Sequence, residues 1–511
     1  MTSPFSRADL HCHSTASQLS KLGVQRALGL PECATPPEDV LELAERRGMD
    51  FVTITDHDTI DGVLTIADDP RVFVSEELTA SFRGEPQSVH VLCWGITPDD
   101  HHRLQERAGD VERVAEYLHD HDIACALAHP FFAVAAPLAP RHRRRLARLF
   151  PVWETRNGSR AAELNQPAQV YIETRGGTGV GGSDDHAGVD IGRTWTQTPR
   201  AATPEEFLEH LRGGRAAAHG EQGSAAKWAH AALGLATRAL GTAGSGDAAE
   251  PLDPRTVFTI VERVVREGDV RAGAIGADLQ PEDARRVLRA WLAAVDLDVD
   301  EAGLLALLQD ASFRHAALYR RARRAHERQL ARAVDHALAA VGPQGDPAAL
   351  GEAAQELFGA CVAAIPYAPA AAFLGREKAK LAGARGEGEQ RRVALVADGV
   401  GSVHGVTRTL AEIRDRGVPG FDVEVVGTDH NVDRRLPAVA EAPVPFYDGL
   451  QVGVPALPDI VETLAEGRYD AVHVCSPGPA GVAATLVAKV MGLPVVGSYH
   501  TELAAYTAMR T

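Results

Sequence analysis

The chain has 511 residues, and its 52 basic and 69 acidic side chains give a formal net charge of −17. This charge argues against nucleic-acid binding by general electrostatics and requires a local cation, arginine or metal, to hold any anionic substrate. With 45% hydrophobic and 24% charged residues, the composition is that of a folded globular protein. Six cysteines without a C-x-x-C pair, and no apolar run of about 18 residues, predict a cytoplasmic protein with no transmembrane segment.

Residues 1–222 alternate short apolar runs with amphipathic segments, which predicts parallel strands joined by helical crossovers. The predicted strands are 50–55, 71–75, 89–94, 124–128 and 180–183, and the predicted helices include 37–47 and 110–119. A proline and two acidic residues open the first of these helices, and Gly48 closes it.

The rest of the chain divides into a helical and an α/β part. Residues 223–390 predict an all-helical linker domain, with helices at 255–266, 281–295 and 313–341. Residues 391–511 predict a Rossmann-like half-domain, with strands at 393–398, 423–426, 471–474 and 495–499 and helices at 406–417 and 481–491. The expected fold class is therefore α/β and multidomain.

Histidine gives the first chemical signal, because fourteen of the 21 histidines fall within residues 1–230. Histidine is the commonest metal ligand and acid–base group. His11 and His13 are two residues apart at the end of a predicted strand, so their side chains share one face. Taken alone, such a pair is equally well explained as two hydrogen-bonded surface residues.

Further histidines and carboxylates fall at the ends of predicted strands, where ligands collect in parallel α/β barrels. They are His57, Asp58, Glu77, His90, His129, Asp184 and His186. Each by itself is compatible with an ordinary structural role; a carboxylate at 56 or 58, for instance, can cap a helix. Together they predict a centre for Zn, Mn or Fe, in which a carboxylate such as Glu77 bridges two ions.

The order of the motifs DLHCHS, TDHDT, ELT, VHVLCWG, AHP, ETRNGS and GSDDH resembles the PHP (polymerase and histidinol phosphatase) family over residues 7–222. The resemblance implies a distorted (βα)7 barrel with two or three divalent ions and hydrolysis of phosphoesters. It implies that His11, His13, Glu77 and Asp184 bind one ion, that Glu77, His90 and His129 bind a second, and that His57 and His186 belong to a third. It also implies that Asn157 orients a ligand or a water molecule.

One position departs from the family pattern. Gln18 stands five residues after His13, where many members carry an aspartate or a histidine for the third ion. An amide oxygen is a poor ligand for Zn or Mn. The third site is therefore expected to be weak, or to be completed by another group such as Glu32 or Cys33.

The expected activity is hydrolysis of a small phosphomonoester or nucleotide phosphate. Divalent ions would lower the pKa of a bound water from about 15.7 to about 7, and Asp58 is a candidate acid for the leaving group. Two alternatives stay open. One is a metallohydrolase of a C–N bond, and the other, prompted by Gln18, is a catalytically weak module that regulates a glycosyltransferase.

Residues 392–511 resemble the acceptor half of family-4 glycosyltransferases of the two-domain GT-B type. The resemblance rests on VALVADGVGSVHGVTRTL, DAVHVCSPGPAG and VVGSYHTELAAY. It implies a sugar or sugar-lipid acceptor, bound by a glycine turn with Gly401 and Gly405 and by His500 at a strand end. The sugar-nucleotide half would lie beyond Thr511, so no sugar transfer is expected from this chain alone.

Overall fold

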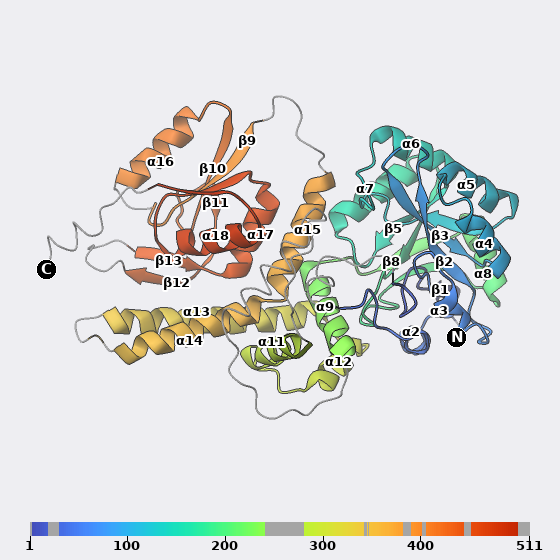
Figure 1. The fold of residues 1–511 in the computed structure, drawn as a ribbon, viewed down its shortest axis with the longest axis horizontal. Coiled ribbons are helices and arrows are strands. Elements are labelled where there is room, and N and C mark those ends of the chain that lie inside the picture. The colour runs from blue at the N-terminus through green and yellow to red at the C-terminus, as the bar shows by residue number, and fades with distance from the viewer. Residues whose placement is uncertain are drawn as a thin grey trace. The chain divides into compact units, whose positions relative to one another are not determined.

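The computed structural model describes residues 3–18, 30–240, 281–341, 345, 347–381, 390–400, 405–443 and 451–498 (Figure 1). The chain forms two compact units. The first comprises Met1–Ser245, Val299–His315 and Lys380–Gly383, and the second Gly246–Asp298, Ala316–Ala379 and Ala384–Thr511. Both contain helices and sheets, so the expected α/β multidomain class is confirmed. The closed barrel, the GT-B half-domain and the boundaries at 222 and 390 remain predictions.

A five-stranded sheet forms the centre of the first unit. Its strands are, in order, β2 (Ser75–Ser81), β3 (Ser88–Trp94), β4 (Ala124–Leu127), β5 (Val152–Asn157) and β6 (Thr178–Gly182). The pairs β4–β5 and β5–β6 are parallel, as predicted, but β2–β3 and β3–β4 are antiparallel. The segment 82–87 between β2 and β3 is too short for a crossover helix, so these strands form a hairpin.

A second, three-stranded sheet contains β1 (Phe5–Ala8), β7 (Thr194–Pro199) and β8 (Ala217–Gly220). The predicted strands at 50–55 and 71–75 are wrong as regular strands. Isolated parallel bridges, Ala8–Phe51, Val52–Val72 and His57–Glu77, replace them. These bridges still place residues 51–57 alongside the start of β2.

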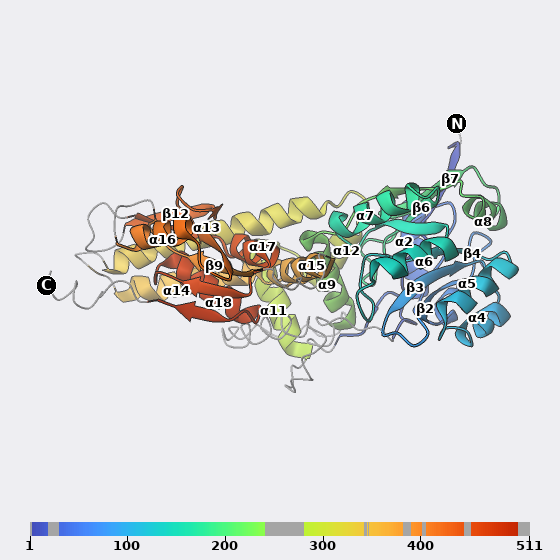
Figure 2. The ribbon, with the colours of Figure 1, turned by 90° about the horizontal axis from the view of Figure 1, so that it is seen from above.

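Helices surround these strands in both views (Figures 1 and 2). They are α2 (Pro37–Arg46), α3 (Asp61–Leu64), α4 (Pro98–Gln105), α5 (Val111–Asp120), α6 (Pro140–Leu149), α7 (Ala162–Glu173) and α8 (Pro204–Arg212). The predicted helices at 37–47 and 110–119 are confirmed as α2 and α5. Gly48 ends α2 with φ 75°, a conformation that costs glycine little.

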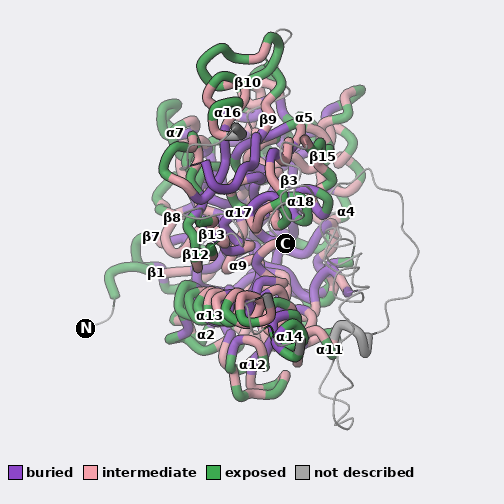
Figure 3. The backbone as a smooth tube through the Cα atoms, turned by 90° about the vertical axis from the view of Figure 1, so that its left-hand side faces the viewer, coloured by how far each residue is buried: buried purple, intermediate pink, exposed green. Residues whose placement is uncertain are grey.

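The core of the first unit lies against β3, which is buried along its whole length (Figure 3). Leu78, Val91 and Trp153 belong to one buried apolar cluster there. The indole of buried Trp94 donates to the carbonyl of Leu10 at 3.0 Å. This contact fixes the chain just before His11.

Helical chain from the middle of the sequence completes the first unit, with α9 (Ala225–Leu240) and α12 (Glu301–Gln309). The Arg193 guanidinium donates to the carbonyls of Asp310 and Phe313 at 2.9 and 3.0 Å. His315 Nε2 lies 2.8 Å from Asp190 Oδ1, and its Nδ1 lies 2.9 Å from Nδ1 of His230. Residues 299–315 thus hold the loop that follows β6.

The second unit has a parallel sheet in the order β11–β10–β9–β14–β15. Its strands are β9 (Arg391–Val396), β10 (Phe421–Gly427), β11 (Arg434–Arg435), β14 (Ala471–Val474) and β15 (Val495–Gly497), and β12 (Ala438–Pro443) pairs separately with β13 (Gln451–Pro455). Helices α16 (Gly405–Arg416), α17 (Leu457–Gly467) and α18 (Pro479–Val490) follow the α/β pattern predicted for this region.

The other helices of the described residues are α11 (Pro281–Ala294), α13 (His315–Val341), α14 (Pro347–Ala364) and α15 (Tyr367–Leu381). The predicted helices at 281–295 and 313–341 are confirmed, and the one at 255–266 lies outside the described residues. Within the described ranges, no single helix has both the length and the apolarity to cross a membrane. The bent pair Ala348–Ala364 and Tyr367–Leu381 meets the two criteria only when taken together.

The contact between His315 and Asp190 is expected to stabilise the first unit. Burial opposes ionisation of Asp190, but Lys227, His315 and Arg193 outweigh it and lower its pKa. Replacing His315 with alanine removes one partner of a buried charge, which is expected to cost about 2–4 kcal/mol of unfolding free energy. Urea unfolding followed by circular dichroism measures the loss.

Arg46→Ala is the control for this experiment, because Arg46 pairs with Glu42 where both side chains are exposed. Its effect is expected to stay below about 0.5 kcal/mol. Equal shifts in the two variants would contradict a stabilising role for the buried contact.

Candidate metal centre

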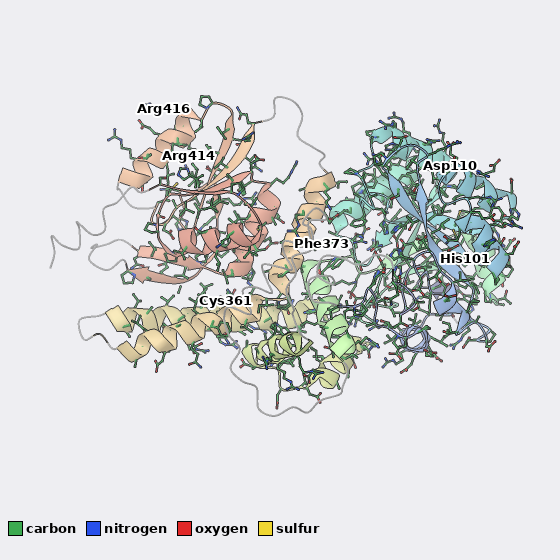
Figure 4. The ribbon with its side chains drawn as sticks, viewed as in Figure 1. His101, Asp110, Cys361, Phe373, Arg414 and Arg416 are labelled. Carbon is green, nitrogen blue, oxygen red and sulfur yellow. The ribbon has the colours of Figure 1, made fainter. Side chains whose placement is uncertain are left out.

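Glu77 is placed by the alternation of side chains along β2. Its neighbour Glu76 points to the opposite face, where its Oε2 contacts Nδ1 of His101 on α4 at 2.8 Å. His101 is labelled in Figure 4. The sequence placed Glu77 just after a strand ending at 75. That placement is wrong, since Glu77 lies inside β2, paired with Leu92 of β3.

The two oxygens of the Glu77 carboxylate face two different groups of histidines. Oε1 lies 2.7 Å from His90 Nδ1 and 3.0 Å from His129 Nε2. Oε2 lies 3.2 Å from His11 Nε2, 3.3 Å from His13 Nε2 and 3.1 Å from His57 Nδ1. This is the geometry of a carboxylate that can bridge two cations.

Asp184 adds a second carboxylate just beyond β6. Its Oδ1 lies 3.6 Å from His11 Nε2 and 3.5 Å from His13 Nε2. Asp184 has φ 51° and His129 φ 25°. Left-handed backbone is uncommon in residues other than glycine and clusters at functional sites, where the surrounding fold sustains the strain.

The residues present fit divalent ions. Five buried atoms of this cluster have no hydrogen-bond partner among the described residues: His11 Nε2, His13 Nε2, His57 Nδ1, His129 Nδ1 and Glu77 Oε2. Polar atoms buried without partners are costly, and bound cations would satisfy them. Four overlapping groups have ligand atoms within 4.8 Å of one another, namely His11–His13–Glu77, His11–His129–Asp184, His57–Glu77–His90 and His13–His57–His186.

Charge is tightly coupled within the cluster. Burial acts to raise the pKa of both Glu77 and Asp184. The nearby charge of His11 holds the pKa of Glu77 well below its usual range, and Arg160, followed by His11, does the same for Asp184. Burial opposes protonation of His13, yet the nearby carboxylates of Asp184 and Glu77 raise its pKa to about 9. Burial and the charge on His13 lower the pKa of His186 to about 3. The carboxylates of Glu77, Glu154 and Asp184 also raise the pKa of His11 well above its usual value. Without metal, His11 and His13 are therefore both protonated, and His186 is neutral.

Glu154, within β5, is a residue of this cluster that the sequence patterns did not single out. Its Oε1 accepts from His11 Nδ1 at 2.9 Å, and its Oε2 accepts from the His129 backbone N–H at 2.8 Å. A proton fixed on Nδ1 leaves the lone pair of His11 Nε2 free for a metal ion. The signal was present, because Glu154 stands three residues before Asn157 in the motif ETRNGS.

Arg160 is the second missed residue. Its Nη2 lies 3.1 Å from Asp184 Oδ2, and its guanidinium stacks 3.9 Å from the ring centre of Phe132. Its Nε and Nη1 are buried and have no hydrogen-bond partner among the described residues. Arg160 therefore offers two further donors beside the metal ligands, a feature suited to an anion.

Asn157 and Asp58, the two residues with predicted catalytic roles, have different hydrogen-bond partners. Asn157 Nδ2 donates to Glu154 Oε2 at 2.9 Å and to Asp184 Oδ2 at 3.1 Å, so this residue positions both carboxylates. Asp58 Oδ1 accepts from the backbone N–H of Thr79 at 2.6 Å. Neither contact tests the catalytic roles predicted for Asn157 and Asp58, which stay predictions.

The helix-cap alternative for Asp56 or Asp58 is wrong, because no side chain caps α3. Both carboxylates are used elsewhere: Asp56 accepts from the backbone N–H of Ser14 at 2.7 Å and from its hydroxyl at 2.6 Å.

Of the residues predicted for the glycosyltransferase part, Gly401 and His500 lie outside the described residues, and Gly405 is the first residue of α16. A nearby feature is described. Asp398, just after β9, accepts from the backbone N–H groups of Ala480 and Gly481 at 2.8 and 3.2 Å. The N-terminus of α18 thus already holds a carboxylate.

Two family profiles match the chain. The PHP-associated profile matches residues 162–216, and the Glycosyltransferase Family 4 profile matches residues 401–510. The chain joins a PHP-associated region to a family-4 glycosyltransferase region. These matches confirm, over residues 162–216 and 401–510, the resemblances drawn from the sequence.

Similar proteins cover parts of the chain. The uncharacterized protein MJ1587 of Methanocaldococcus jannaschii is 38% identical over 56 residues, which are 11% of this chain and 31% of that protein, so the match spans under a third of the relative. PsfC from Pseudomonas syringae is 16% identical, with a TM-score of 0.30 over 40% of this chain and 88% of its own. An amidohydrolase from Chromobacterium violaceum is also 16% identical, with a TM-score of 0.30 over 40% of this chain and 96% of its own. Such TM-scores are too low to establish a shared fold.

Glu154→Gln is expected to weaken metal binding by about 10–100-fold, because the His11 ring loses the carboxylate that fixes its tautomer. Calorimetric titration of the metal-stripped chain with Mn²⁺ measures the affinity. Glu173→Gln, an exposed change at the end of α7, is the matched control. Unchanged affinity in the Glu154 variant would contradict the positioning role.

Metal binding at pH 7 is expected to release a proton from His13, because its pKa is about 9 without metal. Affinity should therefore rise with pH up to about 9. Titrations in buffers of different ionisation enthalpy count the released protons, and His13→Gln should lower the count by about one. Binding without proton release would show that His13 is not displaced from its protonated state.

Proposed function

We propose that the first unit is a metal-dependent phosphoesterase that acts on a small phosphomonoester or a nucleotide phosphate. The observation that carries the proposal is the Glu77 carboxylate between two groups of histidines, together with Arg160, which pairs with Asp184. The PHP-associated match to residues 162–216 supports it. His11, His13, Glu77 and Asp184 would hold one ion, and Glu77, His90 and His129 a second.

Arg160 gives the site its preference for phosphate. Two of its nitrogens have no hydrogen-bond partner among the described residues, and Phe132 limits the movement of the guanidinium plane. A planar guanidinium with free N–H groups matches phosphate oxygens well. In a chain with net charge −17, this local cation and the bound ions would overcome general repulsion of an anionic ester.

The ions, when bound, would polarise the phosphoryl group and make a water molecule nucleophilic near neutral pH. The chain's own residues prepare the site for this. Glu154 keeps the proton of His11 on Nδ1, and Asn157 aligns the Glu154 and Asp184 carboxylates. Asp58 is the proposed acid for the leaving group.

The same donor set could polarise the carbonyl of a C–N bond. Arg160 favours phosphate, because a neutral amide leaves the two buried donors of this residue unsatisfied. The other alternative, a catalytically weak module that regulates a glycosyltransferase, requires a centre that binds metal weakly. For the second unit, we propose binding of a sugar or sugar-lipid acceptor, which the family-4 match to residues 401–510 supports.

The full chain with Mn²⁺ is expected to release inorganic phosphate from p-nitrophenyl phosphate or a mononucleotide. His13→Ala and Glu77→Ala should each lower kcat/KM by more than about 100-fold, because each removes a metal ligand. Full activity in the double variant would overturn the proposal. Release of ammonia from an amide panel, without release of phosphate, would favour the C–N alternative.

Arg160→Met is expected to lower kcat/KM for a phosphomonoester by about 100-fold, because two N–H donors to the phosphate are lost. Arg175→Met is a matched control: Arg175 also stacks on an aromatic ring, 3.7 Å from the centre of Tyr171, but is exposed at the end of α7. Equal effects of the two changes would exclude a specific role for Arg160.

A further inference from the structure

The side chain of Gln18 is not directed to a metal site. It is exposed, and its Nε2 donates to the carbonyl of Thr15 at 2.7 Å. This contact closes a local turn of the backbone. The residue at this position therefore leaves the third group of ligands, around His57 and His186, without the aspartate or histidine that the family pattern places there.

Glu32 supplies a carboxylate at the same place from further along the chain. It is completely buried, and its Oε1 lies 3.4 Å from His57 Nε2 and 3.9 Å from His186 Nε2. Ligand atoms that share one ion at about 2.0–2.2 Å lie roughly 3–4 Å apart. The spacing of these three atoms fits a shared ion.

Ser17 holds Glu32 in position. Its hydroxyl donates to Glu32 Oε1 at 3.3 Å and accepts from the backbone N–H of His57 at 3.3 Å. The same hydroxyl lies 3.4 Å from His13 Nδ1. One side chain thus joins Glu32 to two of the histidines of the centre.

The rings around Glu32 are oriented for an ion. His186 Nδ1 lies 3.2 Å from the carbonyl of Asp184, so a proton there leaves the lone pair of Nε2 on the side of Glu32. The His186 ring also stacks on His13, with centroids 4.1 Å apart. Ligand atoms of His13, His57 and His186 lie within 4.8 Å of one another.

Cys33, the other substitute that the sequence suggests, does not point to this group. Its Sγ donates to the carbonyl of His13 at 3.4 Å, and the residue is 1% exposed. A thiol that donates to a backbone carbonyl is not acting as a thiolate ligand.

We propose that Glu32 is a ligand of a third divalent ion, which it holds together with His57 and His186, in place of the aspartate or histidine that the family pattern has at position 18. The inference rests on the metal centre proposed above but not on its phosphatase activity. With Glu32 as a ligand, the centre of this chain would hold three ions rather than two.

The test counts ions. Metal-stripped full-length chain is titrated with Mn²⁺ by calorimetry, and bound metal is measured by elemental analysis after dialysis. The wild type should bind three ions and Glu32→Gln two, with affinity for the third ion lowered by more than the roughly 10–100-fold that loss of an outer partner costs. Glu38→Gln, an exposed change in α2, should keep three.

Glu32→Asp provides a second variant that keeps the charge. Its shorter side chain should weaken the third ion while the affinity for the other two is unchanged, and thermal unfolding in chelator should match the wild type. Equal counts and affinities in wild type and both Glu32 variants would overturn the proposal and leave a two-ion phosphoesterase intact. Fewer than two ions in the wild type would instead contradict the proposed function.

Discussion

The candidate metal centre of the first unit depends on one buried carboxylate, Glu77, which contacts five histidines. It is fully buried, and burial alone would drive it to its neutral form. Histidines on both sides keep it ionised, and these come from parts of the sequence as distant as His11 and His90. The arrangement leaves several ring nitrogens buried without hydrogen bonds among the described residues. Cations at this point would satisfy the nitrogens and the carboxylate together.

Several elements of the fold hold the residues of this centre in place. The β2–β3 hairpin carries Glu77 and His90, and Glu154 of β5 connects His11 to the backbone of His129. The loop after β6 carries Asp184 and His186, and residues 299–315 hold the same loop through Asp190 and Arg193. Chain far from the metal ligands in sequence therefore supports their geometry, and the helical segment is more than a spacer.

Much of this centre was predictable, because histidines and carboxylates that recur together at strand ends are typical of a metal site. The alternation of apolar runs located β3, β4 and β6 well. It failed at residues 50–55 and 71–75, where isolated bridges replace strands, and so misplaced Glu77 relative to β2. The alternation of strands and helices predicted parallel strands. That prediction did not take into account that the connection between β2 and β3 is too short for a helix, which makes this pair antiparallel.

Glu154 and Arg160 were missed for a physical reason: their roles are to position and to balance charge, and such contacts depend on which strands become neighbours. Residues 299–315 posed the same problem, since helical periodicity does not show where a helix packs. For Glu32 the sequence could only offer a choice between two neighbouring residues. The directions of the Glu32 and Cys33 side chains distinguish them.

We infer that these side chains hold at least two cations around Glu77. Crystals of the Mn²⁺-loaded chain, measured near the manganese absorption edge, locate the bound ions. Two or more anomalous peaks are expected, with ions on both oxygens of the Glu77 carboxylate. Absence of anomalous density beside Glu77, or one ion bound elsewhere, would contradict it.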